Sequence, residues 1–507
     1  MAKPAKPFNE RISLGDKNSG RIQCRNSINI GHLKRIPWWG RGTCIILLMT
    51  AINACSLQFE DVNQGDPTSN SYQTELPSEI SASKIIIDEV ANDQGESLCD
   101  GYQPTLITDF EVRQTIPLQE APARIEFLDP VFDTCLVRVT DHSEIIDPDE
   151  PTQGLKNEYS RVQSFNADGS FILVMSTTGN WYVYDGVTLD LLGQLPISVE
   201  PRWDAEDPDL LYFIEETALM SHRLSTGSTE IVHEFRNDFP DNRISAVWTR
   251  YEGRPTADTR YWGLMAEDEE WMPVALLIYD LKADQVISMR EVDNRKDIDS
   301  VTISPLGNYL LAFHDDYCEV GQLGDDVNPC GLMIYDRNLQ NGRGLLRIVG
   351  HSDLVMDGNG REVLVFQDID TDYLSMLNLE SGEITPLWSI DFSHSAIGFH
   401  FSGNAYQQPG WILVSTYNGA QPSATWMDDQ VFALELKPGG RVVRFAHSRS
   451  LWDENQEHDY WAEPHASVNQ DFTRILFTSN WGRSGSEEVD MYLIELPNDW
   501  MVNLSHE

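Results

Sequence analysis

Basic residues are scarce in this chain. Its 507 residues include 36 Lys and Arg against 80 Asp and Glu, which gives a formal net charge of −44 at pH 7. A surface this acidic repels the phosphate backbone of nucleic acids. We therefore expect no nucleic-acid partner, and solubility in a salty medium is the simplest account of the charge.

The motifs of several chemistries are also missing. No C-x-x-C pair occurs, which removes support for zinc ribbons and thiol redox chemistry. The sequence contains neither a G-x-S-x-G nucleophile elbow nor a glycine-rich phosphate loop, so neither a serine triad nor a nucleotide cofactor is indicated. With 41% hydrophobic residues, the chain can still bury a large core.

The apolar run near the N-terminus, TCIILLMTAINA, is short and follows several basic residues. About a dozen apolar residues are too few for a settled membrane-spanning helix but suit an export signal. The run ends INAC at Cys55, which resembles the lipobox of bacterial lipoproteins. The resemblance implies removal of residues 1–54 and lipidation of Cys55. An uncleaved signal anchor is the alternative.

The residue after Cys55 is Ser56 rather than Asp, and the same resemblance then implies sorting to the outer membrane. We expect an extracytoplasmic protein, periplasmic or at the cell surface, that contacts the membrane only through its lipid. Residues 55–98 are rich in Ser, Asn, Gln, Asp and Glu and are predicted to form a flexible tether. The folded domain is predicted over residues 99–507.

Four cysteines remain beyond the tether, and they allow three pairings. The local pairing, Cys99 with Cys135 and Cys318 with Cys330, closes short loops. Disulfides of this kind form in oxidising compartments outside the cytosol. We predict the local pairing.

A unit of four short strand-like runs recurs along the chain. Seven copies can be recognised with a period near 50, and they begin near Tyr159, Glu200, Arg243, Asp299, His351, His394 and His465. Such self-similarity is typical of a β-propeller, whose small sheets bury their faces against their neighbours. We predict an all-β, seven-bladed β-propeller, because a β-sandwich, the alternative, would not reuse the same turn residues seven times.

One strand-like run, TCLVRVTD from Thr134 to Asp141, stands before the first full copy. It is predicted to be an outer strand that completes the last blade and closes the ring. Closure of this kind removes the free edges of a linear array.

The copies resemble the TolB-type propeller repeat. The resemblance rests on the turns FNADG (Phe165 to Gly169) and ISPLG (Ile303 to Gly307), and on three strands that end in Tyr-Asp at Asp185, Asp280 and Asp336. It covers roughly residues 124–500 and implies the architecture only, since one fold serves many functions.

Polar residues gather just before the inner strand of each repeat, where they are expected to face one end of the central channel, the mouth. They are Tyr159, Arg161, Glu200, Arg202, Arg243, Ser300, His351, Asp353, His394, His400, Glu463 and His465. Strands of different blades converge on one axis, so these residues can meet there. We predict that Glu200, Arg202 and Asp353 bind a ligand, together with Trp481, although tryptophans of propellers more often pack between blades.

The last copy, HASVNQDFTRILFTS from His465, resembles the last blade of the oligogalacturonate lyases. In that family a divalent ion held by histidines and a glutamine neutralises a uronate carboxylate, while a further histidine removes the proton at C5. The resemblance implies a Mn, Zn or Ca ion, and it matches His465 with its strand residue by residue. From repeat register we expect the ion on His351, on His394 or His400, and on His465. We expect catalytic roles for Tyr159, Arg161 and His400. The family's histidine-glutamate-glycine-proline-tryptophan segment has no counterpart here.

The sequence therefore favours an exported, monomeric, lipid-anchored propeller that binds a glycan or a peptide at a histidine-rich mouth. A metal-dependent lyase of uronate-containing glycans is the first alternative. A protein–protein scaffold of the cell envelope is the second.

Overall fold

The computed structural model describes most of the chain after residue 98. The described residues are 99, 101–144, 146, 154–197, 199–241, 243–292, 298–395, 397–418, 422–453 and 455–504, and all belong to the unit Ile80–Glu507. The export signal, the lipidation site Cys55 and the tether 55–98 fall outside these residues.

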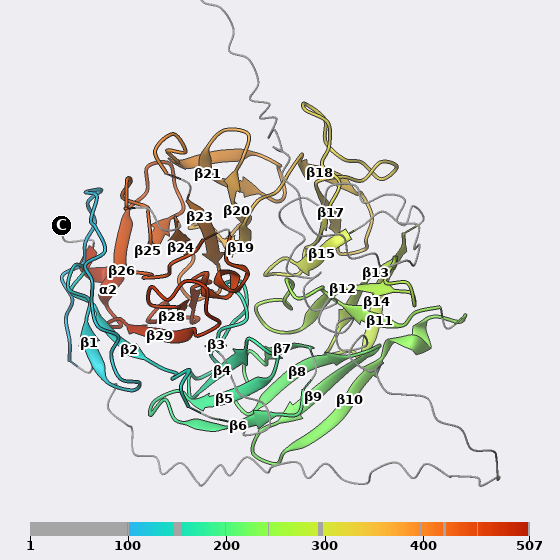
Figure 1. Cartoon of the computed structure of the whole chain (residues 1–507). Helices are drawn as coiled ribbons and strands as arrows, with labels where there is room; N and C mark the ends of the chain where they lie inside the picture. Colours follow the sequence, from blue (N-terminus) through green and yellow to red (C-terminus); the bar gives the residue numbers. More distant parts are fainter. Residues whose placement is uncertain are drawn as a thin grey trace, which may run out of the picture. The chain divides into compact units, whose positions relative to one another are not determined.

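Seven small antiparallel sheets follow one another around a ring, so the predicted seven-bladed β-propeller is confirmed (Figure 1). Blade 1 comprises β3 (Leu155–Lys156), β4 (Phe171–Ser176), β5 (Trp181–Asp185) and β6 (Leu191–Leu195). Blade 2 comprises β7 (Val199–Trp203), β8 (Leu210–Glu215), β9 (Ala218–Arg223) and β10 (Ser228–Glu234). Blade 3 comprises β11 (Ala246–Trp248), β12 (Tyr261–Glu267), β13 (Pro273–Asp280) and β14 (Gln285–Glu291). Blade 4 comprises β15 (Ile298–Ile303), β16 (Tyr309–His314), β17 (Leu332–Asp336) and β18 (Arg343–Leu346). Blade 5 comprises β19 (Ser352–Met356), β20 (Glu362–Asp368), β21 (Tyr373–Asn378) and β22 (Ile384–Ser389). Blade 6 comprises β23 (Gly398–Ser402), β24 (Trp411–Tyr417), β25 (Gln430–Glu435) and β26 (Val442–His447).

The last blade is built from both ends of the described chain. Its sheet order is β1 (Glu126–Leu128), β2 (Cys135–Arg138), β29 (Asp490–Glu495), β28 (Arg474–Ser479) and β27 (Ser467–Val468). Leu136 faces Ile494 and Arg138 faces Tyr492 across the β2–β29 junction. The predicted closing strand at Thr134 to Asp141 is therefore confirmed.

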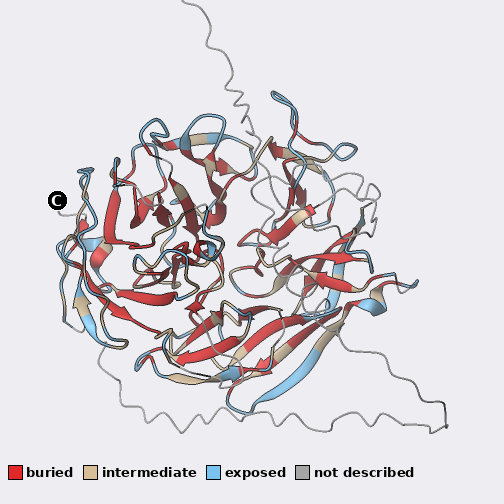
Figure 2. Cartoon of the chain, in the orientation of Figure 1, coloured by how far each residue is buried: buried red, intermediate tan, exposed pale blue. Residues whose placement is uncertain are grey.

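Apolar side chains between neighbouring blades form the core. One cluster joins Val365 and Leu374 of blade 5 to Phe401 and Val414 of blade 6, and burial concentrates on the inner and middle strands (Figure 2). The outermost strand β10 is largely exposed. Each blade thus depends on its neighbours for a dry face.

The turn chemistry of the repeat explains its glycines. In FNADG the Asp168 carboxylate accepts the Ser170 amide at 3.0 Å, and Gly169 takes the left-handed φ of +76° that favours glycine. A Cβ on Gly186, after the Tyr-Asp strand end, would lie 2.0 Å from the Gly169 carbonyl oxygen. Only glycine fits at that position.

The first blade differs from its predicted boundaries. Its inner strand β3 ends at Lys156, before the predicted start at Tyr159. Residues 159–162 form a turn instead, in which the Val162 amide donates to the Tyr159 carbonyl. This turn places Tyr159 and Arg161 at the mouth rather than along a strand.

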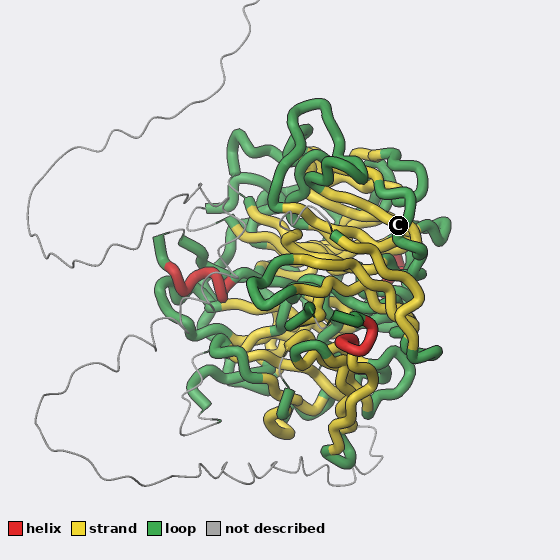
Figure 3. The backbone as a smooth tube through the Cα atoms, turned by 90° about the vertical axis from the view of Figure 1, so that its right-hand side faces the viewer, coloured by secondary structure: helices red, strands yellow, loops and turns green. Residues whose placement is uncertain are grey.

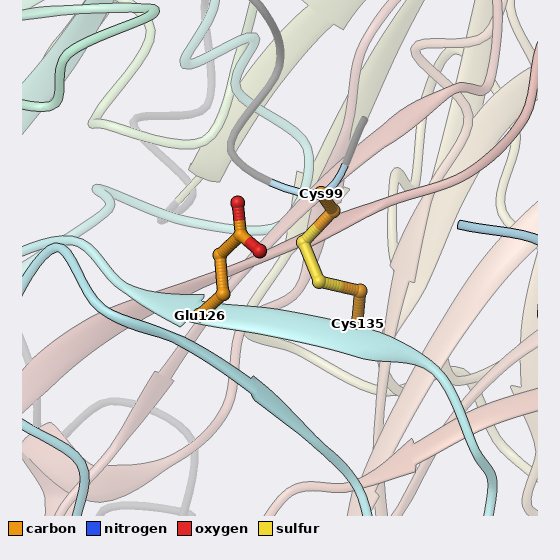
Figure 4. Close-up of side chains that lie close together, drawn as sticks. All are labelled: Cys99, Glu126 and Cys135. Carbon is orange, nitrogen blue, oxygen red and sulfur yellow. A yellow bond between two sulfur atoms is a disulfide. The ribbon is translucent and has the colours of Figure 1, made fainter. Parts of the chain in front are cut away.

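Both predicted disulfides are present. Cys99 bonds to Cys135 at the start of β2 (Figure 4), and Cys318 bonds to Cys330 in blade 4. The helical segments among the described residues are η2 (Phe235–Asp238), η3 (Glu457–Ala462) and α2 (Trp500–Asn503) (Figure 3). Within the described residues, none of the helices has the length and hydropathy needed to cross a membrane.

Candidate metal and ligand site at the mouth

Three histidines from successive blades meet at the mouth. His351 precedes β19, His400 lies in β23, and His465 stands two residues before β27. The ring centroids of His400 and His465 are 4.2 Å apart, and those of His351 and His400 are 4.6 Å apart. His400 and His465 are each only 1% exposed, so the cluster lies below the surface of the mouth.

Glu463 completes a group of metal-ligand type with two of these histidines. The candidate ligand atoms of His400, Glu463 and His465 all lie within 4.8 Å of one another. Glu463 Oε2 is 3.0 Å from His400 Nε2 and 3.4 Å from His465 Nε2. Ligands at 2.0–2.1 Å from a tetrahedral ion are about 3.4 Å apart. The three side chains are therefore already close to the spacing that one ion requires.

The buried imidazoles lack partners that a metal would supply. Nδ1 of His465 and Nδ1 of His400 are buried without a hydrogen-bond partner among the described residues, and His465 Nε2 has only the long contact of 3.4 Å to Glu463. Each buried unsatisfied polar group costs about 1–3 kcal/mol. His465 also has a left-handed backbone, with φ of +40°, which adds local strain. Two imidazoles and one carboxylate form a donor set suited to Zn or Mn, so a divalent metal fits these residues.

Burial keeps the imidazoles uncharged. It lowers the pKa of His400 to about 3, helped by the positive charges of Arg161 and Lys156. Burial also lowers the pKa of His465 well below its usual value, with a further contribution from His400. Neutral imidazole is the form that binds a metal.

His351 belongs to a second pair beside the ligand group. The Tyr159 Oη lies 3.2 Å from His351 Nδ1, and the Tyr159 ring contacts His465 at a centroid distance of 4.8 Å. Burial raises the pKa of Tyr159 well above 10 and lowers that of His351 well below 6.5. The pair therefore consists of a phenol next to a neutral imidazole.

Arg161 places a positive charge next to this pair. Its guanidinium lies 5.5 Å from the Tyr159 ring centroid. Nε donates to the Ser352 carbonyl at 2.7 Å, and Nη1 donates to Glu252 Oε2 at 2.6 Å. Glu252 is part-exposed, so an incoming anion can compete with it for Arg161.

Arg254 lies across the channel axis below the cluster. From blade 3 its Nη1 donates to the Arg161 carbonyl, to Asp353 Oδ2 and to Asn404 Oδ1 at 2.6, 3.0 and 2.8 Å, while Nη2 donates to the Leu354 carbonyl. These partners belong to blades 1, 5 and 6 or their inner connections. The side chain is 7% exposed, so it forms a floor to the mouth.

The side chains of three residues predicted to bind a ligand, Glu200, Arg202 and Asp353, instead form hydrogen bonds or ion pairs between blades. Glu200 accepts the Thr249 amide at 3.0 Å, and Arg202 donates to Glu158 at 2.7 Å. Asp353 pairs with Arg254. All three side chains are buried, and in the structure they join blades around the channel.

Two other predicted site residues lie outside the cluster. The His394 side chain is 70% exposed and its Nδ1 is 2.7 Å from Asp391. The structure therefore does not bring it to the buried ligand group, because the loop after β22 turns it to solvent. Trp481 stacks on Tyr492 at 4.6 Å, and its indole N–H donates to the Leu118 carbonyl at 2.9 Å.

Of the histidines predicted as ligands, the assembled group contains His400, the alternative to His394, and His465. It also contains Glu463, and it lacks His351 and His394. Glu463 received no role from the sequence, although its position two residues before His465 placed it at the mouth. Repeat register identifies which side chains face the channel. It does not show which atoms come within reach of one another.

Two further groups of potential ligands are already engaged in bonds within the protein. Cys99, Glu126 and Cys135 lie close together (Figure 4), but the two sulfurs are joined in a disulfide. His142 and Asp490 form the second group with Glu120. Arg138 donates to Asp490 there, and Arg483 donates to Glu120 at 2.7 Å. The arginines supply the positive charge that a metal would bring.

Solved structures of known function share this architecture. An oligogalacturonate lyase in complex with manganese matches with a TM-score of 0.51 and 16% identity, over 78% of this chain and 98% of that protein. The oligogalacturonate lyase of Vibrio parahaemolyticus matches with a TM-score of 0.51 and 14% identity, over 79% of this chain and 100% of that protein. The chain shares their fold.

TolB from Acinetobacter baumannii, also a propeller protein, is more distant. It has a TM-score of 0.31 and 14% identity, over 59% of this chain and 65% of TolB, which is too low to support an argument about function. No protein-family model matches the sequence, and no curated protein does so.

Proposed function

We propose that this protein is a metal-dependent lyase that cleaves uronate-containing glycans by β-elimination at the mouth of the propeller. The observation that carries the proposal is the His400–Glu463–His465 group with the His351–Tyr159 pair directly beside it. The shared fold of an oligogalacturonate lyase that binds manganese supports it.

His400, Glu463 and His465 would hold the divalent ion. Such an ion would supply positive charge for the uronate carboxylate, which would make the proton at C5 more acidic. Glu463 provides the one negative charge of the set, and its distance to both imidazoles keeps the three donors on one side of the site.

The His351–Tyr159 pair is placed to move the protons of the reaction. In β-elimination the C5–H bond breaks, a C4–C5 double bond forms, the C4–O4 bond breaks and O4 takes up a proton. His351 Nδ1 and Tyr159 Oη are 3.2 Å apart. A proton accepted by one can therefore be passed to the other and on to O4, as general acid–base catalysis requires.

Arg161 would orient the substrate. Its guanidinium lies beside Tyr159, and the Glu252 carboxylate that now occupies one of its donors is part-exposed. A uronate carboxylate can take the place of Glu252, because planar guanidinium groups bind carboxylates through paired N–H donors.

Export and lipid anchoring at Cys55 are part of the same proposal. An extracytoplasmic location would bring the enzyme to a polymer, and the disulfides Cys99–Cys135 and Cys318–Cys330 agree with an oxidising compartment. The expected partner is a glycan, with the protein acting as a monomer.

The test is a screen of uronate polymers with added Mn²⁺, in which the unsaturated product is followed by its ultraviolet absorbance. We expect His351→Ala to lower the rate by roughly 100- to 10,000-fold, the usual contribution of a general acid or base. His465→Ala should abolish both metal binding and turnover. His394→Ala is the matched control, because the same side chain is removed at an exposed position, and it should leave the rate unchanged.

The alternatives give different results. A protein without bound metal and without product on any uronate polymer would refute the lyase. Retention on a polysaccharide column without product would support the glycan-binding protein favoured by the sequence. Co-purification of envelope proteins, unaffected by the histidine variants, would support the scaffold.

A further inference from the structure

A cavity of about 530 Å³ lies beside the last two blades, away from the histidine cluster. One wall is the segment Gln114–Leu118, here called the arm, which precedes the first strand. The opposite wall comes from the connections of blades 6 and 7, and includes Asp429, Arg449, Leu451 and Trp481. The volume is within the roughly 300–1,000 Å³ of small-molecule sites.

The backbone around this cavity is strained at three positions. Asp429, Arg449 and Trp481 have φ of +56°, +53° and +48°, in the left-handed region that residues other than glycine seldom adopt. Strained residues of this kind cluster at binding and catalytic sites. All three residues line one cavity, which indicates that the shape of the cavity is maintained at a cost in local backbone strain.

Two charged side chains are buried in the wall. Arg449 is 7% exposed, and its Nε has no hydrogen-bond partner among the described residues. Its other nitrogens donate to the Ile116 carbonyl at 2.7 Å and to Asp129 at 3.4 Å. Asp429 is 8% exposed and accepts the Asn418 amide through one oxygen at 3.1 Å. Both side chains line the cavity, so its wall contains polar groups.

The charges of the wall are balanced. Asp129 offsets the positive charge of Arg449, and burial raises the pKa of Asp429 to about 7. No excess positive charge is left for a carboxylate ligand. The remaining lining is largely apolar and includes Ile116, Pro117 and Leu118. This combination matches a ring that carries hydroxyl groups but no charge.

We infer that the arm cavity is a binding site for a neutral sugar residue. The arm closes over the ring from one side, and Asp429, Arg449 Nε and Gln114 bond its hydroxyls. Trp481 lines the cavity but is not a stacking platform, because Tyr492 covers one face of its ring and the Arg449 guanidinium lies 5.0 Å from its centroid.

A chain of ring contacts links the histidine cluster to the cavity. Tyr417 stacks on His400 at 5.6 Å, Trp452 contacts Tyr417 at 5.6 Å, and Leu451, next to Trp452, lines the cavity. A glycan that presents a uronate at the cluster could therefore place a neutral sugar in the cavity. This extension rests on the proposed function, whereas sugar binding itself does not.

Saturation-transfer NMR measures the binding of glucose, galactose, rhamnose and xylose, and the affinity of each is compared with that of galacturonate. The measurements are made on the full chain and on its His465→Ala variant. We expect at least one neutral sugar to bind both proteins with equal affinity and galacturonate to bind the cavity more weakly. Thr115→Trp adds a ring to the exposed arm wall and should lower the affinity by about tenfold or more. Gln119→Trp, one residue beyond the arm and outside the lining, should leave the affinity unchanged.

Gln114→Trp is a second filling variant, and circular dichroism checks that each variant folds. Failure of all four neutral sugars to bind would overturn the inference, as would equal binding by both filling variants and the wild type. The His465→Ala variant lacks one of the three proposed metal ligands. Sugar binding by this variant therefore tests the cavity whether or not the protein is a lyase.

Discussion

His465 combines three unfavourable features at one residue. It is buried, its ring nitrogens have no partner among the described residues beyond a 3.4 Å contact from Nε2 to Glu463, and its backbone is left-handed. A residue selected for stability alone would avoid each of them. The pattern is typical of a functional residue whose cost is met by the surrounding fold.

The carboxylate of the ligand group provides the sharpest test at the residue scale. Glu463→Gln keeps the size of the side chain but removes the negative charge that faces both imidazoles. We expect Mn²⁺ affinity to fall by at least about 10- to 100-fold, the loss seen even when outer-shell partners are changed. Calorimetric titration with Mn²⁺ measures it.

Glu487→Gln is the matched control for this prediction. Glu487 also faces a histidine, since its Oε1 is 2.7 Å from His458 Nδ1, but it lies outside the ligand group. Its substitution should leave the affinity unchanged. Equal affinities for wild type and Glu463→Gln would remove Glu463 from the metal site.

At this scale the sequence predicted positions better than roles. His465 and His400 were predicted at the mouth from repeat register, and both lie there. The contribution of Glu463 depends on the conformation of three side chains from two blades, which no local pattern encodes. His394 was misplaced relative to the cluster because the length of a loop decides whether its residues turn inward.

At the scale of elements, the ring depends on the junction between β2 and β29. Arg138 of β2 donates to Asp490 of β29 through Nε and Nη2 at 3.1 and 2.8 Å. The Asp490 side chain is completely buried. The junction thus joins the two ends of the folded chain by a buried ion pair as well as by the strand ladder.

We expect Arg138→Met to lower the free energy of unfolding by about 3 kcal/mol, because it removes the two guanidinium bonds to the buried Asp490 carboxylate and leaves His142, Thr140 and Arg483 as its partners. Urea unfolding measures the loss. Arg223→Met is the control, since Arg223 pairs with Asp207 and Asp209 at an exposed site, where about 0–1 kcal/mol is expected. Similar losses for the two variants would contradict a special role of the junction.

The elements themselves were largely predictable. Seven copies of one turn chemistry indicated seven blades, and an unpaired strand before the first copy indicated closure. The short inner strands β3 and β27, of two residues each, were harder to place. The residues beside them are held by side-chain bonds between neighbouring blades, such as that from Asn157 to the His465 carbonyl, which strand propensity does not register.

At the scale of the whole molecule, buried histidines link stability to pH. Burial lowers the pKa of His447 to about 4, below the 6.5 of an unfolded chain, so the unfolded state takes up its proton first. The stability that His447 contributes is therefore complete above pH 6.5 and is lost as the pH falls toward 4. Burial raises the pKa of Asp429 to about 7, so this residue adds stability as the pH falls, opposite to His447. The contribution of His447 is therefore obtained as the difference between the wild type and a His447 variant.

His447→Gln makes that difference measurable. The amide can still donate to the Arg113 carbonyl, which His447 Nε2 contacts at 3.0 Å, but it does not titrate. Between pH 7 and pH 4 the wild type should lose stability relative to the variant by an amount of the order of 3 kcal/mol. Urea unfolding at several pH values measures it, and parallel curves would show that His447 titrates normally in the folded protein.

The floor formed by Arg254 bears on how the proposed lyase would handle a polymer. Because this side chain bonds to blades 1, 5 and 6 across the axis, it blocks the described channel at that level. A substrate chain of the proposed enzyme would therefore not be threaded through the ring. It would lie sideways across the open face, and both fragments would leave from that same face.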